Sequence, residues 1–416
     1  MSSFNHNNND GSKEIVFTGI GMITAHGYGF QSSLDALEKK HTRSSIDDYK
    51  IKNFNPAPYL TDRKVVKVVS PRDVLGLVAF EECVKAAGLT REGMNRERIG
   101  LYVGAPPSST VDNTNYAEAI EATRDSYGQI REAEFGKTFR SASPTTLLSG
   151  LPNNVLCYGS KTLDARGPNS NYTTLETSGH LSVIGASRAM RLGRLDCAIA
   201  GGFSAHTDSI ILESLHRHKV LKESTSPDSY QVTPFSTSEE GGTIPADGAA
   251  FISMEFRGEA VARGVTPLAT LLSGGTASEA QWPFTGAKDS STLVGLMSDI
   301  LEKAGVQKDQ IGLVAVSGSG VPHIDLVEKD AVTTFFAATQ DLPPIICTTT
   351  AWGNLMEAGG IAEIGAMACY YKSGQIPSQV MLQIGKSCEF NPNKKTVGLV
   401  LRTSLSGEYT GLVVRF

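Results

Sequence analysis

Long apolar runs are missing from this sequence. Its 416 residues contain no uninterrupted stretch of 18 or more uncharged apolar residues, so we expect no membrane-spanning helix. The opening segment MSSFNHNNNDGS is polar and rich in asparagine, and it lacks the apolar core of a signal peptide. We therefore expect residues 1–12 to form a disordered tail and the protein to be cytoplasmic. The net charge of −5 shows no excess of positive charge, so neither nucleic acid nor a membrane is an expected partner.

Motifs that hold metals, disulfides or phosphates are also missing. The six cysteines show no CxxC spacing and the eight histidines form no HExxH pattern, so we expect buried reduced thiols and no metal site. The glycine pairs at 201–202, 241–242 and 359–360 occur without a GxGxxG pattern or a Walker lysine. We interpret them as turns and close-packing positions, and we expect no cofactor.

The first half of the chain contains strand-like and helix-like segments in alternation. The β-branched run 15–22 ends on glycines, 74–87 has apolar residues three and four apart, and 99–103 again favours a strand. A segment of small residues, 179–192, is followed directly by the apolar run 196–200. This combination indicates a helix packed inside the protein rather than on its surface.

The second half repeats the same alternation. Helices are expected at 293–304 and 354–371, and strands at 311–316 and 396–402. The repetition predicts an α/β protein of layered sheets and helices with a duplicated architecture.

Six sequence motifs follow one another in the order of a known family. They are VFTGIGMITAHG (16–27), SPTTLLSGLPNN (143–154), RGPN (166–169), TSG (177–179), GRLDCAIAGGF (193–203) and VTPFSTSEEGGTIPADGAAFISME (232–255). On these motifs the sequence resembles the β-ketoacyl synthase family over nearly the whole chain. The resemblance implies the thiolase fold, with duplicated αβαβα layered halves at residues 13–270 and 271–416.

The resemblance also identifies the positions that the family uses for condensation. There, a cysteine begins a buried central helix, whose dipole and free N–H groups lower the thiol pKa and stabilise the oxyanion. Two histidines in HGT and GH motifs, a lysine and a GFGG loop complete the site. Counting from the motifs puts Glu176 at the position of the cysteine. Ser317 and Asn354 take the places of the histidines and Thr349 that of the lysine, and the loop reads LSGE at 405–408.

These substitutions remove the chemistry of condensation. A carboxylate is a poor partner in thioester exchange, because its acyl product would be an anhydride that water or a thiol destroys. Serine and asparagine can hydrogen-bond to a carbonyl group, but neither carries the proton or the positive charge of a histidine. We therefore expect no catalytic residue at the four positions and no condensation by this chain alone.

Within the family, the sequence resembles the chain-length factors of type II polyketide synthases. The resemblance implies a heterodimer with an active ketosynthase subunit, an acyl carrier protein as a second partner, and an interface tunnel that sets polyketide length. Such subunits often carry glutamine at the cysteine position, so Glu176 suggests a divergent branch. The candidate tunnel and interface residues are Tyr116, Ile120, Thr145, Thr146, Leu147 and Leu148.

Three other interpretations of the site remain open. Glu176 can be purely structural, because a carboxylate at a helix N-terminus accepts N–H bonds and is stabilised by the dipole. It can instead have a chemical role, as in a subunit that decarboxylates malonyl-acyl carrier protein. A homodimeric scaffold unrelated to polyketides is the third alternative. His180 and His323 fall at non-catalytic positions, and Asp247 and Glu363 are expected to support loops.

Overall fold

The elements of the fold come from a computed structural model, which describes residues 11–39, 42–90, 94–107, 118, 120–138, 146–207, 210–223, 230–236, 241–339, 342–385 and 387–416. The strands are β1 (Ile15–Thr24), β2 (Gly27–Tyr28), β3 (Ile99–Gly104), β4 (Ser170–Tyr172), β5 (Cys197–Ser204), β6 (Gly248–Phe256), β7 (Ala269–Ser278), β8 (Ile311–Ala315), β9 (Ile345–Ile346), β10 (Met381–Leu382), β11 (Val397–Thr403) and β12 (Glu408–Arg415). The α-helices are α1 (Phe30–Asp35), α2 (Pro71–Ala86), α4 (Glu132–Thr138), α5 (Thr146–Ser149), α6 (Asn154–Leu163), α7 (Ser178–Arg191), α8 (Ile210–Arg217), α9 (Arg257–Ala262), α10 (Ser291–Ala304), α11 (Pro322–Phe336), α12 (Thr349–Trp352) and α13 (Gly359–Ser373). Within this part of the chain, no helix combines the length and the apolar character needed to traverse a bilayer.

The strand order shows an internal duplication. The described strands form one continuous sheet in the order β10-β9-β8-β11-β12-β7-β1-β6-β5-β3-β4, with β2 paired to β1. From β1 the sheet runs through antiparallel β6 and β5 to parallel β3 and β4. From β7 it runs through antiparallel β12 and β11 to parallel β8 and β9. The two runs have the same directions in the same order, which confirms the predicted duplication.

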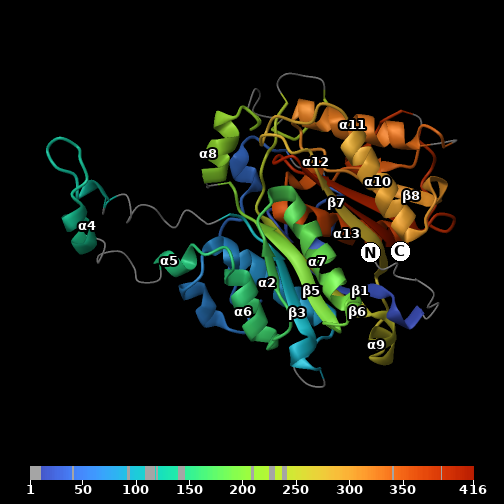
Figure 1. Cartoon of the computed structure of the whole chain (residues 1–416), viewed down its shortest axis with the longest axis horizontal. Helices are drawn as coiled ribbons and strands as arrows, with labels where there is room; N and C mark the ends of the chain where they lie inside the picture. Colours follow the sequence, from blue (N-terminus) through green and yellow to red (C-terminus); the bar gives the residue numbers. More distant parts are fainter. Residues whose placement is uncertain are drawn as a thin grey trace.

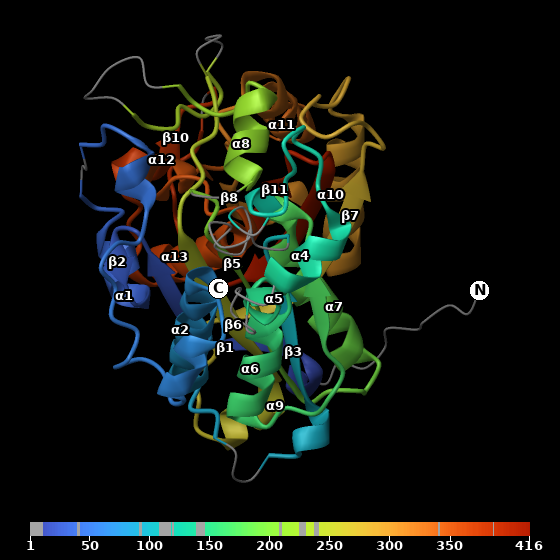
Figure 2. The same cartoon turned by 90° about the vertical axis from the view of Figure 1, so that its left-hand side faces the viewer.

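Helices form layers on and between the two halves of the sheet. α2 and α6 pack together on the first half, where Figure 2 shows them side by side, while α10 packs on β7 and β12 with α11 against it. Between the halves, α7 contacts β3 and β5, α13 contacts β6 and β11, and the two helices contact each other. Figure 1 shows α10 and α11 at the upper right, α2 and α6 at the lower left, and α7 between them. This layering is that of the thiolase fold, as the sequence predicted.

Glycines allow the two central helices to lie close together. A Cβ atom on Gly179 of α7 would lie 2.4 Å from the backbone oxygen of Glu357, two residues before α13 begins. A Cβ atom on Gly360 of α13 would lie 2.4 Å from the ring of His180 on α7. Real side chains do not approach so closely, so both positions require glycine. The interpretation of 359–360 as a close-packing position is confirmed at Gly360.

One predicted helix is wrong at its start. The helix expected at 354–371 begins only at Gly359, and α12 ends at Trp352. Gly353 and Met356 have φ values of 80° and 43°, in the left-handed region, and the chain cannot continue as a right-handed helix through such residues. Asn354 therefore lies in a loop between two helices.

The outer limits assigned from the sequence are only partly covered by the structure. Residues 1–10 of the expected tail lie outside the described residues, and Gly11–Lys13 form a short 3-10 turn. The division of the chain after residue 270 stays a prediction. That boundary would fall inside β7, which begins at Ala269.

Candidate functional site

Glu176 lies immediately before the central helix α7. It belongs to the 3-10 turn Leu175–Thr177 and is 1% exposed. The turn opens with Leu175 at a φ of 55°, which is an unfavourable value for a residue with a Cβ atom. The same arrangement precedes α13, where the turn Met356–Ala358 opens with Met356 at a φ of 43° and contains the buried Glu357. The duplication therefore places a buried glutamate before both central helices, and sequence reasoning recognised only the first.

The carboxylate of Glu176 accepts three hydrogen bonds from other parts of the chain. Asn354 Nδ2 donates to Oε1 at 3.2 Å, and Ser404 Oγ and the backbone N–H of Leu405 donate to Oε2 at 2.9 and 3.2 Å. Burial raises the pKa of Glu176, while Arg402 and the bonds from Ser404 and Leu405 lower it. The position that the sequence motifs predict for the family's nucleophile thus carries a hydrogen-bond acceptor that is already engaged.

Asn354 is fixed by bonds on both ends of its side-chain amide. Besides Glu176, its Nδ2 donates to Thr243 Oγ1 at 3.1 Å, and its Oδ1 accepts the backbone N–H of Met356 at 3.0 Å. Its backbone N–H donates to the carbonyl oxygen of Ile244 at 2.8 Å. Asn354 therefore ties Glu176 to the segment before β6.

Ser317 is hydrogen-bonded to Thr349 and to the end of β11. Thr349 Oγ1 donates to the carbonyl oxygen of Ser317 at 2.8 Å, and Ser317 Oγ accepts the backbone N–H of Thr403 at 2.6 Å. Cys347 also donates its thiol to the carbonyl oxygen of Ser317 at 3.4 Å, and burial raises the pKa of this thiol. Of the three other substituted positions, only Asn354 has a described hydrogen bond to Glu176.

Arg402 is a positively charged residue among the buried glutamates of this region. It is 1% exposed, and its Nη1 lies 3.0 Å from Oε1 of Glu363, which is 0% exposed. Nearby, Glu328 accepts the backbone N–H groups of Ser317 and Gly318 at 2.9 Å each. Glu363 therefore joins α13 to β11 through Arg402. Sequence reasoning missed Arg402, although a single charged residue in the otherwise apolar run VGLVLRT was a signal that could have identified it.

The remaining polar residues singled out from the sequence do not supply a charge to this site. His180 is fully buried with Nδ1 3.0 Å from Thr410 Oγ1, and burial together with Arg402 lowers its pKa to about 3. His323 lies on α11 with its Nε2 2.9 Å from the carbonyl oxygen of Phe284. Asp247 accepts from Thr207 Oγ1 at 2.8 Å and from the backbone N–H of Ile51 at 3.0 Å, so it joins two loops.

The candidate tunnel residues are only partly covered by the structure. Tyr116 and Thr145 lie outside the described residues. Ile120 is partly buried, and the short helix α5 carries Thr146, Leu147 and Leu148, of which Leu148 is 53% exposed. A tunnel role for these residues stays a prediction.

The cysteines form no disulfide, and they differ in exposure. All six cysteines are free; Cys83, Cys197 and Cys347 are buried, whereas Cys157 on α6 is exposed, so the expectation of a buried thiol is wrong there. In the described ranges, no three His, Cys, Asp or Glu side chains are grouped so as to hold a metal ion.

The buried carboxyl groups give stability a pH dependence. Burial raises the pKa of Asp325 and that of Glu363 to about 7, from ordinary values of 3.8 and 4.5. At a pH between the ordinary and the raised values, the folded protein keeps these protons and the unfolded chain releases them. We expect the free energy of unfolding, measured with urea, to fall as the pH rises from about 5 to 7. His180 opposes this trend as a single group, because its lowered pKa makes acid destabilising. Asp325→Asn should flatten the slope, and a wild-type slope of opposite sign would contradict the assignment.

Comparisons with known proteins agree with this fold. The N-terminal domain model of the beta-ketoacyl synthases matches residues 18–260, and the C-terminal domain model matches residues 268–383. The mitochondrial 3-oxoacyl-[acyl-carrier-protein] synthase of Arabidopsis thaliana is 25% identical over 384 residues, which cover 84% of this chain and 80% of the relative. The 3-oxoacyl-[acyl-carrier-protein] synthase 2 of Staphylococcus aureus is 24% identical over 367 residues, covering 85% and 84%.

Two solved structures show the same fold over almost the whole chain. One is a type II PKS acyl-carrier protein in complex with its ketosynthase bound to the hexaketide, with a TM-score of 0.77, 17% identity, and 97% and 99% of the two chains covered. The other is the ishigamide ketosynthase/chain length factor, with a TM-score of 0.76, 19% identity and the same coverage. Together with the two domain models, which span most of the sequence, these findings show that the chain belongs to the β-ketoacyl synthase family.

Proposed function

We propose that this chain is a non-condensing, chain-length-factor-type subunit of a type II polyketide synthase. The observation that carries the proposal is the engagement of Glu176 by Asn354, Ser404 and Leu405 at the position of the family's nucleophile. A carboxylate held in this way forms no stable acyl intermediate. Decarboxylative condensation also needs groups that move a proton or stabilise an enolate, and Ser317 and Asn354 only offer neutral hydrogen bonds.

A subunit of this kind acts through a partner, which we propose is an active ketosynthase. β4 is the last strand of the sheet at one end, and its three residues are all partly exposed. An edge strand of this kind can pair with another chain. The similar structures include a ketosynthase/chain length factor and a ketosynthase in complex with an acyl-carrier protein. We therefore propose a ketosynthase heterodimer served by an acyl carrier protein.

Co-expression with candidate ketosynthases tests the proposal. We expect the chain to co-purify with one ketosynthase as a heterodimer in size-exclusion chromatography, and the pair to make a polyketide of defined mass from malonyl-acyl carrier protein. The chain alone should make none. Full condensing activity of the chain alone would refute the proposal.

The tunnel assignment makes a separate prediction about product length. If Tyr116 or Leu147 closes the tunnel, Tyr116→Ala or Leu147→Ala enlarges it, and the reconstituted pair should make a product at least one two-carbon unit longer. Mass spectrometry of the products measures this change. Leu192→Ala is a matched control, because Leu192 is 55% exposed and follows the last residue of α7. Unchanged length in both tunnel variants would remove these residues from the tunnel.

One observation favours a second candidate, an enzyme that uses Glu176 chemically. Burial raises the pKa of Glu176, and a carboxyl group that keeps its proton can act as a general acid. Carbon dioxide release by the isolated chain from malonyl-acyl carrier protein, abolished in Glu176→Ala, would establish this role. The subunit proposal predicts release no faster than in buffer, because none of the hydrogen bonds to Glu176 among the described residues comes from an imidazole that could stabilise the enolate.

A further inference from the structure

One apolar cluster joins helix α8 to the turn that contains Glu176. Leu175 and Leu405 belong to this cluster, together with Ile211 and Leu215 of α8. Leu175 precedes Glu176 in the chain, and the backbone N–H of Leu405 donates to its carboxylate. The apolar side chains of α8 therefore lie on the side of the site where these two neighbours are, and they contribute to the burial of Glu176.

The two faces of α8 differ in character. Leu215 is fully buried and Ile211, four residues earlier, is partly buried, whereas Glu213 and Arg217 are exposed and bond to each other at 2.7 Å. Residues four apart lie on the same face of a helix, so the apolar pair is on the face toward the cluster and the charged pair is on the face toward solvent. Figure 1 shows α8 at the upper left, on the outside of the molecule.

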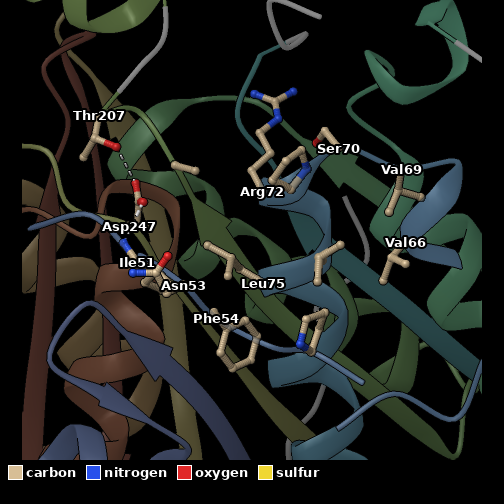
Figure 3. A pocket seen from close by; sticks show the side chains of 14 residues that line it. Ile51, Asn53, Phe54, Val66, Val69, Ser70, Arg72, Leu75, Thr207 and Asp247 are labelled. Carbon is tan, nitrogen blue, oxygen red and sulfur yellow. Dashed lines mark hydrogen bonds between the residues drawn. The ribbon is translucent and has the colours of Figure 1, made fainter. Parts of the chain in front are cut away.

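The chain is fixed on both sides of α8. Before the helix, Thr207 Oγ1 donates to Asp247 at 2.8 Å, a bond that Figure 3 shows in the wall of an open cavity of about 610 Å³. After the helix, Thr243 donates its backbone N–H to the carbonyl oxygen of Val220 at 2.7 Å, and its own carbonyl oxygen accepts the N–H of Lys222 at 2.9 Å. Between these anchors, none of the described helices and strands packs extensively against α8, so its apolar face is what holds it.

A segment with little packing between two fixed ends can open locally while the rest of the protein stays folded. We propose that α8 is a lid over the Glu176 position, closed in this structure, which opens when its apolar face leaves the cluster while the anchors at Thr207 and Thr243 hold. The second anchor is linked to the site, because Asn354 donates both to Thr243 Oγ1 and to Glu176. That an acyl thioester would enter under this lid rests on the proposed function, whereas the lid itself does not.

Alkylation of a thiol at position 176 tests the lid in the full chain. Iodoacetamide can reach the thiol of Glu176→Cys only when the site opens, and mass spectrometry of the digested protein gives a separate rate for each cysteine. We expect position 176 to react at least about tenfold more slowly than the exposed Cys157, and faster than Cys347, which is buried in another core cluster. Low concentrations of urea should raise the rate at Cys347 but hardly that at position 176, because lid opening exposes little surface.

Two outcomes of this measurement would overturn the lid. A rate at position 176 as high as that of Cys157 would mean that the site is already open. Equal urea slopes at position 176 and at Cys347 would mean that the site opens only by global unfolding. Neither rate requires a ketosynthase partner or a product, so failure of the lid leaves the proposed function standing.

Two leucine substitutions in the Glu176→Cys protein separate the lid from the core. Leu215→Ala removes packing from the apolar face of α8 and should raise the rate at position 176 at least about tenfold. Leu293→Ala is the matched control, because Leu293 is equally buried but belongs to the cluster that contains Cys347. It should raise the rate at Cys347 and leave that at position 176 unchanged. Ile211→Ala should give a smaller rise than Leu215→Ala, and it decides the question if Leu215→Ala does not fold; an unchanged rate at position 176 would overturn the proposal.

Discussion

Glu176→Cys in the isolated chain is expected to give a protein that still forms no condensation product. The new thiol would stand at the N-terminus of α7, where the helix dipole and free N–H groups lower a thiol pKa, so slow acylation is expected. Decarboxylation of malonyl-acyl carrier protein would still lack imidazoles at positions 317 and 354. A positioned acid–base group contributes about 10²–10⁴-fold, so we expect turnover at least ~10³-fold below that of an intact ketosynthase assayed in parallel.

Intact-protein mass spectrometry separates the two steps. An acyl mass increase on Glu176→Cys, without any elongated product, is the expected result. Glu176→Gln is the control for the change of side chain, and it should show neither. Elongation by Glu176→Cys at a rate close to that of the intact ketosynthase would mean that the hydrogen bonds of Ser317 and Asn354 suffice for the chemistry, and it would contradict the proposed inactivity.

The sequence predicted the features that local pattern controls. The alternation of strands and helices, the buried helix at 179–192 followed by a strand, and the duplication are all present as α7, β5 and the two matching runs of strands. The motif register also put Glu176 at the N-terminus of the central helix, where the structure has it. The individual strands and helices depend on residues near one another in the chain, whereas the place of Glu176 was implied by the resemblance to the family's motifs.

The partners of Glu176 could not be predicted in the same way. Ser404 and Leu405 are 228 and 229 residues away in sequence, and the sheet and central helices bring them together. The sequence predicted a helix from 354 and so missed the loop that brings Asn354 to Glu176, because apolar spacing does not show the left-handed φ values at Gly353 and Met356. Apolar spacing carries no signal for a side-chain network of this kind.

Arg402→Met is expected to lower the free energy of unfolding by about 3–5 kcal/mol, because it leaves a buried carboxylate without its counter-ion. Arg402 and Glu363 are both almost fully buried and 3.0 Å apart. Arg402 also lowers the pKa values of Glu176 and Glu328, so its loss raises the pKa values of all three acids. The destabilisation should therefore be larger at pH 8, where the acids must ionise, than at pH 5.5. Urea unfolding at the two pH values measures the difference.

Two further variants distinguish loss of the ion pair from loss of packing. Arg217→Met breaks a pair of similar length, 2.7 Å to Glu213, whose side chains are 76% and 58% exposed, and it should change stability little because water solvates both charges. The double variant Arg402→Met/Glu363→Leu should recover part of the stability lost in Arg402→Met, because it removes the uncompensated carboxylate as well. Equal urea midpoints for Arg402→Met and Arg217→Met would contradict the prediction, because they would mean that Arg402 does not neutralise the buried acids. The charge of Arg402 would then not contribute to stabilising the carboxylate of Glu176.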